Sequence, residues 1–436
     1  MRIALVNPPN IEHTGTFRPP INLAILAAYV RQHGHEVRIY DFEQEGEDDA
    51  QALTNILMNY KPDVIGFTCL TPRYPIIAKI SKFCKMISKD IIILLGGPHV
   101  AGDPESVFYD SAIDYAIIGE GEEALVDFLN YLKNGQDVRS IPNLAYRQDN
   151  SIQTNPTRPF IKDLEALPFP AWDLLNIKAY VDPAMFKSNY MGIISARGCA
   201  WDCIFCASKV VWKRIVRMRS AENLLEEIRI LINKYGISEF MFYDDTFSID
   251  RKRTLKICEL IKQEHLKIRF YVSLRADTID KEIAEALKEA GCLVVFIGVE
   301  SGDDKILKMT GKGITKNQIR QTVKALKAAD LPILASFILG LPGDTRKTIQ
   351  ATINFAKELN TEQVRFLIAV PYPGTRLYDL ALKKGILQKP DPMKLGDYSY
   401  YQHVAVNFSE VSDEELMQYQ KQAYEEYDLI KRPIAN

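Results

Sequence analysis

The sequence lacks any apolar run long enough to cross a membrane, and it lacks an excess of charge of either sign. A membrane-spanning helix needs about 20 apolar residues, and no stretch of the chain approaches that length. The 54 Lys and Arg nearly balance the 56 Asp and Glu, which gives no sign of a nucleic-acid surface. The N-terminal segment MRIALVNPPN is typical of a first β-strand rather than of a signal peptide. We therefore expect no transmembrane segment, no nucleic-acid partner and a cytoplasmic location.

The number and spacing of the cysteines also give no sign of a set of disulfide pairs. The chain has seven cysteines, an odd number, and three of them lie within eight residues while the other four are scattered. This distribution does not suit the disulfide framework of a secreted domain. It favours a cofactor site in a reducing compartment.

Residues 1–138 alternate short apolar strands with helices. The predicted strands are 2–6, 36–41, 63–70, 91–95 and 115–118, and the predicted helices are 21–33, 48–60, 74–88 and 122–133. Near-continuous apolar strands separated by helices indicate an α/β fold with a doubly wound parallel sheet of the Rossmann-like type.

In such a sheet a ligand binds beyond the carboxyl ends of the strands. Gly, Pro, Thr and His residues follow four of the predicted strands. Any one of these loops alone could be a tight turn, but four on one edge predict a binding site. The candidate ligand-binding residues are Pro8, Thr68, Thr71, Gly96, Gly97, His99, Gly119, Glu120 and Gly121.

The rest of the chain divides into three parts. Residues 139–188 hold six prolines with little periodicity and predict a linker. Residues 189–396 alternate again, with predicted strands at 191–196, 239–243, 269–274, 293–299, 333–339 and 364–369. This pattern indicates a partial (β/α)6 TIM-like barrel, whose chemistry gathers at the carboxyl ends of the strands. Residues 397–436 end in an acidic helix, 413–430, which predicts a short helical cap.

The first barrel strand leads into the loop RGCAWDCIFC, in which Cys199, Cys203 and Cys206 follow a C-x3-C-x2-C spacing. Three thiolates on one loop can hold three irons of a cubane cluster. The next cysteine, Cys258, lies 52 residues beyond Cys206, so one iron would stay open. A structural zinc site would want a fourth ligand, and three inert buried cysteines in one loop are a weaker alternative.

This motif, with an aromatic residue directly before its last cysteine, resembles the signature of radical S-adenosylmethionine (SAM) enzymes. The resemblance implies a [4Fe–4S] cluster on Cys199, Cys203 and Cys206, SAM bound at the open iron, and a 5′-deoxyadenosyl radical made with an electron donor such as flavodoxin or ferredoxin. It also implies SAM contacts at the strand ends. Tyr-Asp-Asp stands where Gly-Gly-Glu is more typical after the second strand. The implied contacts are Phe205, Tyr243, Asp244, Asp245, Arg275, Glu300, Ser301 and Gly340.

The front half, with its Asn-Pro-Pro, Gly-Gly-Pro-His and Gly-Glu-Gly-Glu loops, is similar to the cobalamin-binding domain of class B radical SAM methyltransferases. The resemblance implies cobalamin as a cofactor and methylation of an unactivated carbon in a small-molecule or peptide substrate. Gly97 stands where the cobalt-ligating motif Asp-x-His-x-x-Gly has its Asp, so we expect no cobalt ligand from His99, which would either touch the corrin or be structural. A non-methylating cyclisation or rearrangement and a non-enzymatic cobalamin-binding module are alternatives.

One basic run follows the cysteine loop. Lys209, Lys213, Arg214, Arg217 and Arg219 lie within eleven residues. A solvated face is one interpretation, and contact with an anionic substrate or cofactor is the other.

Overall fold

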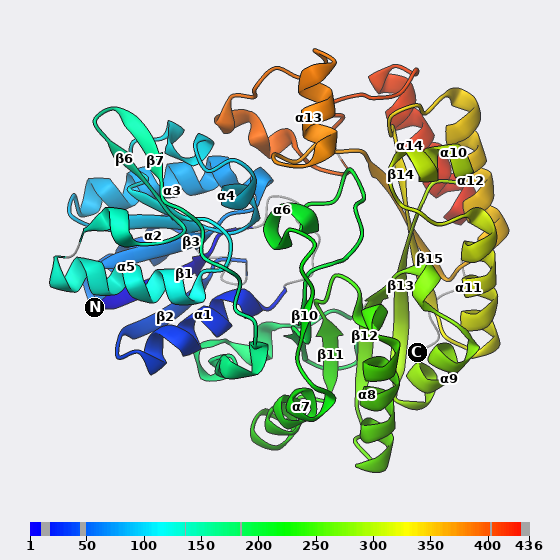
Figure 1. The fold of residues 1–436 in the computed structure, drawn as a ribbon, viewed down its shortest axis with the longest axis horizontal. Helices are drawn as coiled ribbons and strands as arrows, with labels where there is room; N and C mark the ends of the chain where they lie inside the picture. The colour runs from blue at the N-terminus through cyan, green and yellow to red at the C-terminus, as the bar shows by residue number, and fades with distance from the viewer. Residues whose placement is uncertain (10–17, 44–48, 136, 184, 402, 429–436) are drawn as a thin grey trace. The chain divides into compact units, whose positions relative to one another are not determined.

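The computed structural model describes residues 1–9, 18–43, 49–135, 137–183, 185–401 and 403–428 (Figure 1). The chain forms two compact units. The first comprises residues 1–189, 372–374 and 389–396, and the second comprises residues 190–371, 375–388 and 397–436.

The first unit is built on a seven-stranded sheet with the order β2-β1-β3-β4-β5-β6-β7. Its first five strands are parallel, which confirms the predicted doubly wound sheet. The strand order turns back between β1 and β3, so the carboxyl ends of these two strands mark the switch point where ligands bind in such folds. The parallel strands are β1 (Arg2–Asn7), β2 (Glu36–Asp41), β3 (Val64–Thr68), β4 (Ile92–Gly96) and β5 (Tyr115–Ile117).

Helices connect these strands close to their predicted positions. The predicted helix 48–60 begins as an α-helix and ends in a π-helical turn, Ile56–Tyr60. A further short helix, α4, begins at the Pro98 of the Gly-Gly-Pro-His sequence and was not predicted. The helices of this unit are α1 (Ile21–Gln32), α2 (Asp49–Asn55), α3 (Tyr74–Ile87), α4 (Pro98–Gly102) and α5 (Glu122–Asn134).

The segment 139–188, predicted as a linker, contributes two strands to the first sheet. β6 (Leu144–Gln148) pairs antiparallel with β5, and β7 (Ser151–Thr154) pairs antiparallel with β6. Asp149 and Asn150 join them with φ angles of 47° and 61°. Two consecutive left-handed residues are typical of the tight turn between hairpin strands. The dipeptide Asp-Asn between two short alternating stretches was therefore the signal for this hairpin.

The second unit contains a six-stranded parallel sheet with the order β15-β14-β13-β12-β11-β8. Its two edge strands do not pair with each other, so the barrel is open, and the predicted partial (β/α)6 barrel is confirmed. The strands are β8 (Tyr190–Ile193), β11 (Glu239–Phe242), β12 (Arg269–Leu274), β13 (Cys292–Glu300), β14 (Ile333–Leu339) and β15 (Gln363–Ile368).

Five long helices follow the barrel strands, and each begins at a residue whose side chain accepts a backbone N–H of the first turn. Such caps satisfy donors that have no partner within the helix. The capping residues are Ser220, Asp250, Asp280, Thr315 and Thr345. The helices are α7 (Ala221–Tyr235), α8 (Arg251–Gln263), α9 (Lys281–Glu289), α11 (Lys316–Ala328) and α12 (Arg346–Leu359).

The C-terminal helix α14 (Asp413–Asp428) covers the edge of the barrel at β15, as the predicted cap requires. The Gln420 side-chain amide donates to the Phe366 carbonyl oxygen at 2.7 Å, and the Tyr424 hydroxyl accepts from the Phe366 N–H at 3.0 Å. An edge strand otherwise offers its backbone groups to other chains, so α14 protects this edge. Among the described helices, none is both long and apolar enough to cross a membrane.

Candidate functional site

The cysteine loop begins just beyond the carboxyl end of β8 and is held at its base by a small hairpin. β9 (Ala196–Arg197) pairs antiparallel with β10 (Arg217–Met218), and the short helix α6 (Ser208–Trp212) lies between them in the chain. Gly198 has a φ of 97°, and a Cβ there would lie 2.0 Å from the Ile215 carbonyl oxygen. Only glycine permits this conformation and this approach, so Gly198 fixes where the loop departs.

Asp244, at the end of β11, ties the loop to the neighbouring strand. Its Oδ1 accepts the backbone N–H groups of Ser195 at 2.7 Å and Ala196 at 3.0 Å, and its Oδ2 accepts the Ser195 hydroxyl. Burial raises the pKa of Asp244. Because both oxygens are engaged within the chain, its surroundings favour a role in holding the start of the cysteine loop over the predicted contact with SAM.

The three cysteines of the motif differ in exposure from the other four. Cys199, Cys203 and Cys206 are partly exposed, whereas Cys69, Cys84, Cys258 and Cys292 are buried, and none of the seven forms a disulfide. Burial of the sulfur atoms raises the pKa of Cys203, and that of Cys206 to about 12. These thiols are therefore protonated until a metal takes them as thiolates.

The donor set fits an iron–sulfur cluster better than a single metal ion. Among the described residues, no three Cys, His, Asp or Glu side chains are arranged to hold one metal ion. A cubane takes one thiolate for each iron, so its cysteines do not need to converge on one point. Three free thiols on one loop satisfy that requirement.

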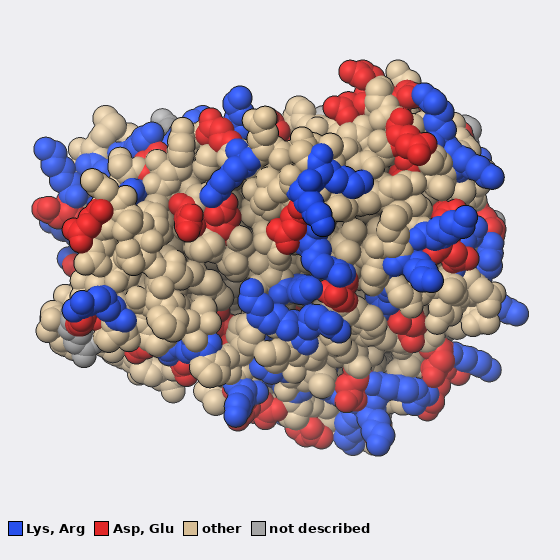
Figure 2. All heavy atoms as spheres, turned by 45° about the horizontal axis from the view of Figure 1, so that its top comes forward, with Lys and Arg blue, Asp and Glu red and all other residues tan. Residues whose placement is uncertain are grey.

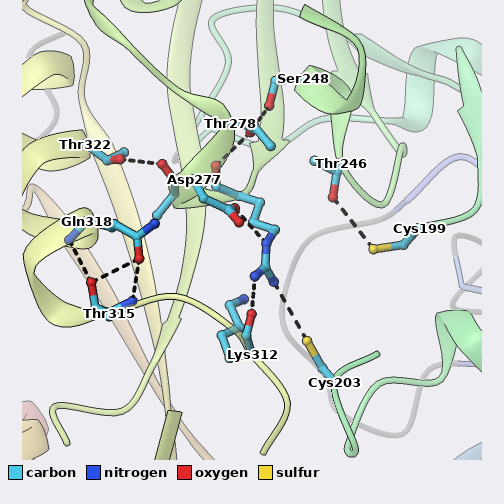
Figure 3. Close-up of polar contacts among 12 residues, drawn as sticks. Cys199, Cys203, Thr246, Ser248, Asp277, Thr278, Lys312, Thr315, Gln318 and Thr322 are labelled. Carbon is cyan, nitrogen blue, oxygen red and sulfur yellow. Dashed lines mark hydrogen bonds and ion pairs between the residues drawn. The ribbon is translucent and has the colours of Figure 1, made fainter. Parts of the chain in front are cut away.

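Arg275 lies beside the thiol of Cys203, which Figure 3 labels together with Asp277 and Lys312. Its Nη1 is 4.0 Å from the Cys203 sulfur, and its guanidinium carbon lies 4.6 Å from the centre of the Trp201 ring. Asp277 pairs with its Nε at 2.7 Å, and the Lys312 carbonyl oxygen accepts from its Nη2. Arg275 is 4% exposed, so these partners fix a buried positive charge next to the cysteine loop.

A buried ion pair between Glu300 and Lys312 adjoins this network. Lys312 Nζ lies 2.8 Å from Glu300 Oε1, and both side chains are 9% exposed. Glu300 has a φ of 67°, which is unusual for a residue with a side chain. A Cβ on Gly298 would lie 2.3 Å from Glu300 Oε1. Gly298 therefore leaves the room that the ion pair needs.

The sequence prediction missed Lys312. Burial lowers the pKa of Lys312, but the Glu300 carboxylate and Cys203 raise it more, so the side chain stays protonated. Lys312 stands between Gly311 and Gly313, which have φ angles of 71° and 70°. The Gly-Lys-Gly tripeptide was the signal that could have identified it.

The other residues predicted to contact SAM have varied surroundings. Asp245 is exposed and accepts the Ser208 hydroxyl at 2.8 Å. Tyr243 is half-buried, and its backbone N–H donates to β8. Phe205 packs against an apolar cluster that includes Leu341 and Ala369. Asp245 and Phe205 thus offer an acceptor and an apolar wall at the carboxyl ends of the barrel strands.

Ser301 and Gly340 contact helices of the same unit. The Ser301 hydroxyl lies 3.3 Å from the Thr352 hydroxyl on α12. Gly340 has a φ of 79°, and a Cβ there would lie 2.7 Å from the Leu416 side chain on α14. Close packing within the chain thus accounts for both residue types.

In the first unit, His99 is buried between two hydroxyl groups. Its Nδ1 lies 3.3 Å from the Thr71 hydroxyl and its Nε2 lies 3.3 Å from the Ser106 hydroxyl. Burial lowers the pKa of His99 to about 4. The imidazole is therefore neutral and both nitrogens have partners, which favours a structural role.

The remaining residues predicted at this edge also contact their own chain. A Cβ on Gly97 would lie 3.0 Å from the Cys69 backbone, and one on Gly121 would lie 3.1 Å from Leu26. A Cβ on Gly96 or Gly119 would lie no closer than 3.8 Å to its neighbours, which is ordinary van der Waals contact. Oxygen atoms of three further residues accept hydrogen bonds from elsewhere in the unit, namely Pro8, Thr68 and Glu120.

The edge nevertheless offers surface to a ligand such as a corrin ring. Leu70 lies between Thr68 and Thr71 beyond the end of β3 and is 41% exposed, which is high for a large apolar side chain at a switch point. The chain therefore provides exposed apolar surface where the resemblance places cobalamin.

The sequence prediction also missed a polar network at the ends of β1 and β2. Asp41 accepts from the Asn7 side-chain amide at 2.7 Å and from the Tyr180 hydroxyl at 2.9 Å. Arg73 donates to the Asn7 side-chain oxygen at 3.0 Å and pairs with Glu43. Burial raises the pKa of Asp41 to about 6. This network fixes the two strand ends beside the switch point.

Comparison with known proteins agrees with this division of the chain. The model of the radical SAM superfamily matches residues 193–356, and that of the B12 binding domain matches residues 9–129. An uncharacterized methyltransferase from Pyrococcus horikoshii is 37% identical, over 89% of this chain and 84% of that protein. An anaerobic magnesium-protoporphyrin IX monomethyl ester cyclase from Rubrivivax gelatinosus is 26% identical, over 91% of this chain and 75% of that protein.

The fold also matches a solved structure. The radical SAM methyltransferase TsrM from Kitasatospora setae, with cobalamin and a [4Fe–4S] cluster bound, superposes with a TM-score of 0.74 at 18% identity. The match covers 89% of this chain and 79% of that chain. The fold is thus shared with a protein whose structure holds both of these cofactors.

Proposed function

Because this chain belongs to the cobalamin-dependent radical SAM enzymes, which use a [4Fe–4S] cluster, SAM and cobalamin, we propose that it is a methyltransferase acting on an unactivated carbon. When bound, the cluster and SAM supply a carbon-centred radical, and cobalamin supplies the methyl group. The three free, partly exposed cysteines beyond the carboxyl end of β8 carry the radical chemistry, and the 37% identity to the methyltransferase from Pyrococcus horikoshii supports the methyl transfer. The substrate would be a small molecule or a peptide.

The chain's own residues would have distinct tasks at the cluster. Cys199, Cys203 and Cys206 would hold it, and Arg275, directly after β12, would face it with a fixed positive charge. Asp244 would act through the backbone of Ser195, as a positioning residue. We expect these thiols to require the reducing conditions of a cytoplasm.

A second group of residues would bind SAM. Asp245 is an exposed acceptor suited to the SAM ammonium group, and Phe205 offers apolar surface to the adenine. Glu300 and Lys312 form a buried pair of opposite charges that suits a zwitterionic amino-acid end. The tight packing around this pair would hold it in place before SAM arrives.

In the first unit, cobalamin would lie against the carboxyl ends of β1 and β3. Leu70, beyond the end of β3, would offer apolar surface to the corrin. Because His99 is bonded on both nitrogens, we expect the cobalt to take no His ligand from this position.

The test is anaerobic reconstitution with iron, sulfide and cobalamin, followed by incubation with SAM and a strong chemical reductant. We expect 5′-deoxyadenosine to form, and we expect none from Cys203→Ala. Cys258→Ala is the matched control, because Cys258 is buried on α8 away from the motif. Deoxyadenosine formation by Cys203→Ala would refute the proposed ligand set.

A non-methylating cyclisation or rearrangement is the second candidate, favoured by the similarity to the cyclase of Rubrivivax gelatinosus. Counting the two products of SAM separates the two functions. A methyltransferase that takes its methyl group from SAM releases S-adenosylhomocysteine and 5′-deoxyadenosine together with each product. The second candidate releases deoxyadenosine without matching S-adenosylhomocysteine.

A further inference from the structure

A basic surface lies directly against the cysteine loop. We call Lys209, Lys213, Arg214 and Arg376 the basic face. Arg214 Nε donates to the Ala200 carbonyl oxygen at 2.9 Å, and Lys209 pairs with Asp202 at 2.6 Å. Both partners belong to the loop that carries Cys199 and Cys203. Figure 2 shows Lys and Arg side chains gathered together on the viewed face.

The basic face carries an excess of positive charge. Asp202 pairs with Lys209 and, at 3.2 Å, with Arg376, so one carboxylate serves two cations. Lys213 and Arg214 are exposed, and no carboxylate in the described part of the chain forms an ion pair with either. The four cations thus share one neighbouring carboxylate, that of Asp202, which leaves an excess of positive charge beside the loop.

The backbone that presents these charges is held in an unusual conformation. Lys213 and Arg214 have φ angles of 50° and 64°, two consecutive left-handed residues with side chains. Such strain persists only where the surroundings enforce it. Here β10 returns the chain to β9, and the Arg217 guanidinium lies 5.4 Å from the centre of the Trp212 ring. The charges are thus presented by a fixed turn.

Exposed apolar side chains stand next to the two charges. Ile215 is 48% exposed and Met218 is 37% exposed. Protein interfaces commonly combine an apolar centre with a charged rim. The surface that lies against the cysteine loop therefore has the composition of a docking site for an acidic protein.

We propose that this basic face docks an acidic one-electron carrier protein of the flavodoxin kind. The inference rests on the proposed function, because radical formation from SAM consumes one electron, which the carrier loses and the enzyme gains. Opposite charges raise the rate at which two proteins meet and orient them. Docking here would bring the carrier against the loop that receives the electron.

The experiment compares two sources of electrons in reconstituted full-length protein. One arm uses titanium(III) citrate, which needs no docking site, and the other uses an acidic flavodoxin with its reductase and NADPH. The readout is 5′-deoxyadenosine formed from SAM, which requires no knowledge of the substrate. The variants are Lys213→Glu and Ile215→Ser, and the matched control is Lys324→Glu, an exposed lysine on α11.

For Lys213→Glu we expect about a tenfold loss of kcat/KM for flavodoxin, and a titanium-driven rate within twofold of wild type. For Ile215→Ser we expect kcat/KM for flavodoxin to fall severalfold. For Lys324→Glu we expect kcat/KM to stay unchanged. Flavodoxin-driven turnover should also fall as salt rises, because salt screens exposed charges.

The outcomes separate the two proposals. If wild type makes no deoxyadenosine with titanium(III), the proposed function fails. If wild type makes deoxyadenosine with titanium(III), the proposed function stands. The docking proposal is then overturned by either of two results: Lys213→Glu has the same kcat/KM for flavodoxin as wild type, or flavodoxin does not support deoxyadenosine formation by wild type.

Discussion

Removing the Arg275 guanidinium should make the proposed cluster harder to reduce. A reduced cluster carries one more negative charge than an oxidised one, so a nearby cation stabilises the reduced state. Arg275 is buried, and its Nη1 lies 4.0 Å from the Cys203 sulfur. Because the site is buried, water could not readily compensate for the loss of this charge.

The size of the effect follows from Coulomb's law. Two unit charges about 4 Å apart interact by about 4 kcal/mol at an effective dielectric constant of about 20. The Asp277 carboxylate lies 2.7 Å from Arg275 Nε and partly cancels the positive charge, so we take the net interaction as about half of this energy, or about 2 kcal/mol. A one-electron couple shifts by about 59 mV for each tenfold change in its equilibrium constant, which is about 1.4 kcal/mol. Arg275→Met should therefore lower the reduction potential by roughly 50–100 mV.

The assay is a redox titration of the reconstituted protein followed by electron paramagnetic resonance of the reduced cluster. Arg275→Lys is the control, because it keeps the charge while losing the planar contact with Trp201, and its potential should move less than half as far. Iron content must match wild type in both variants. An Arg275→Met protein with full iron content and an unchanged potential would refute the reasoning.

Three further predictions concern stability. The pKa of His99 is about 4 in the folded chain against 6.5 when unfolded, so the unfolded state binds more protons between these values. The free energy of unfolding should then fall by up to about 3 kcal/mol as pH drops from 6.5 to about 4. Denaturant unfolding at pH 7 and pH 5 should show a smaller fall for His99→Gln than for wild type. Gly298→Ala should lower Tm by several degrees, because its Cβ would displace the neighbouring ion pair, whereas Gly396→Ala, which meets nothing within 4 Å, should not. Asp244→Ala should unfold at lower denaturant than Asp244→Asn, because alanine leaves buried N–H groups without an acceptor.

Much of the fold could be predicted because its strands are apolar and its helices carry caps. The predicted strands 36–41, 269–274 and 333–339 coincide with β2, β12 and β14. The hairpin β6–β7 could not be read as easily, because its alternation is short and prolines surround it. Its strands gain most of their stability from pairing with β5, which is a tertiary effect that local patterns do not carry.

The candidate site was predictable only where a motif is local in sequence. Cys199, Cys203 and Cys206 stand in one loop, and their spacing alone indicated the chemistry. Arg275 was identified as a strand-end residue, but its proximity to Cys203 depends on how two strand-end loops meet. Lys312 was missed because it follows a short helix, α10 (Asp304–Met309), that itself was not predicted.

The segment that follows α10 helps to fix the conformation of the cysteine loop, which the motif's own residues do not determine alone. The Thr310 carbonyl oxygen accepts the Ile204 N–H at 2.9 Å, and a Cβ on Gly311 would lie 2.7 Å from the Asp202 carbonyl oxygen. The next carbonyl, that of Lys312, accepts from the Arg275 guanidinium beside Cys203. Three consecutive residues thus brace the cysteine loop and its neighbouring cation from one side, while Asp244 holds the start of the loop from the other. Most residues of the cysteine loop are partly exposed, so burial of apolar side chains does little to fix its conformation. The polar contacts must therefore determine its shape. The positions of the three cysteines thus depend on the barrel as a whole and not on the loop alone.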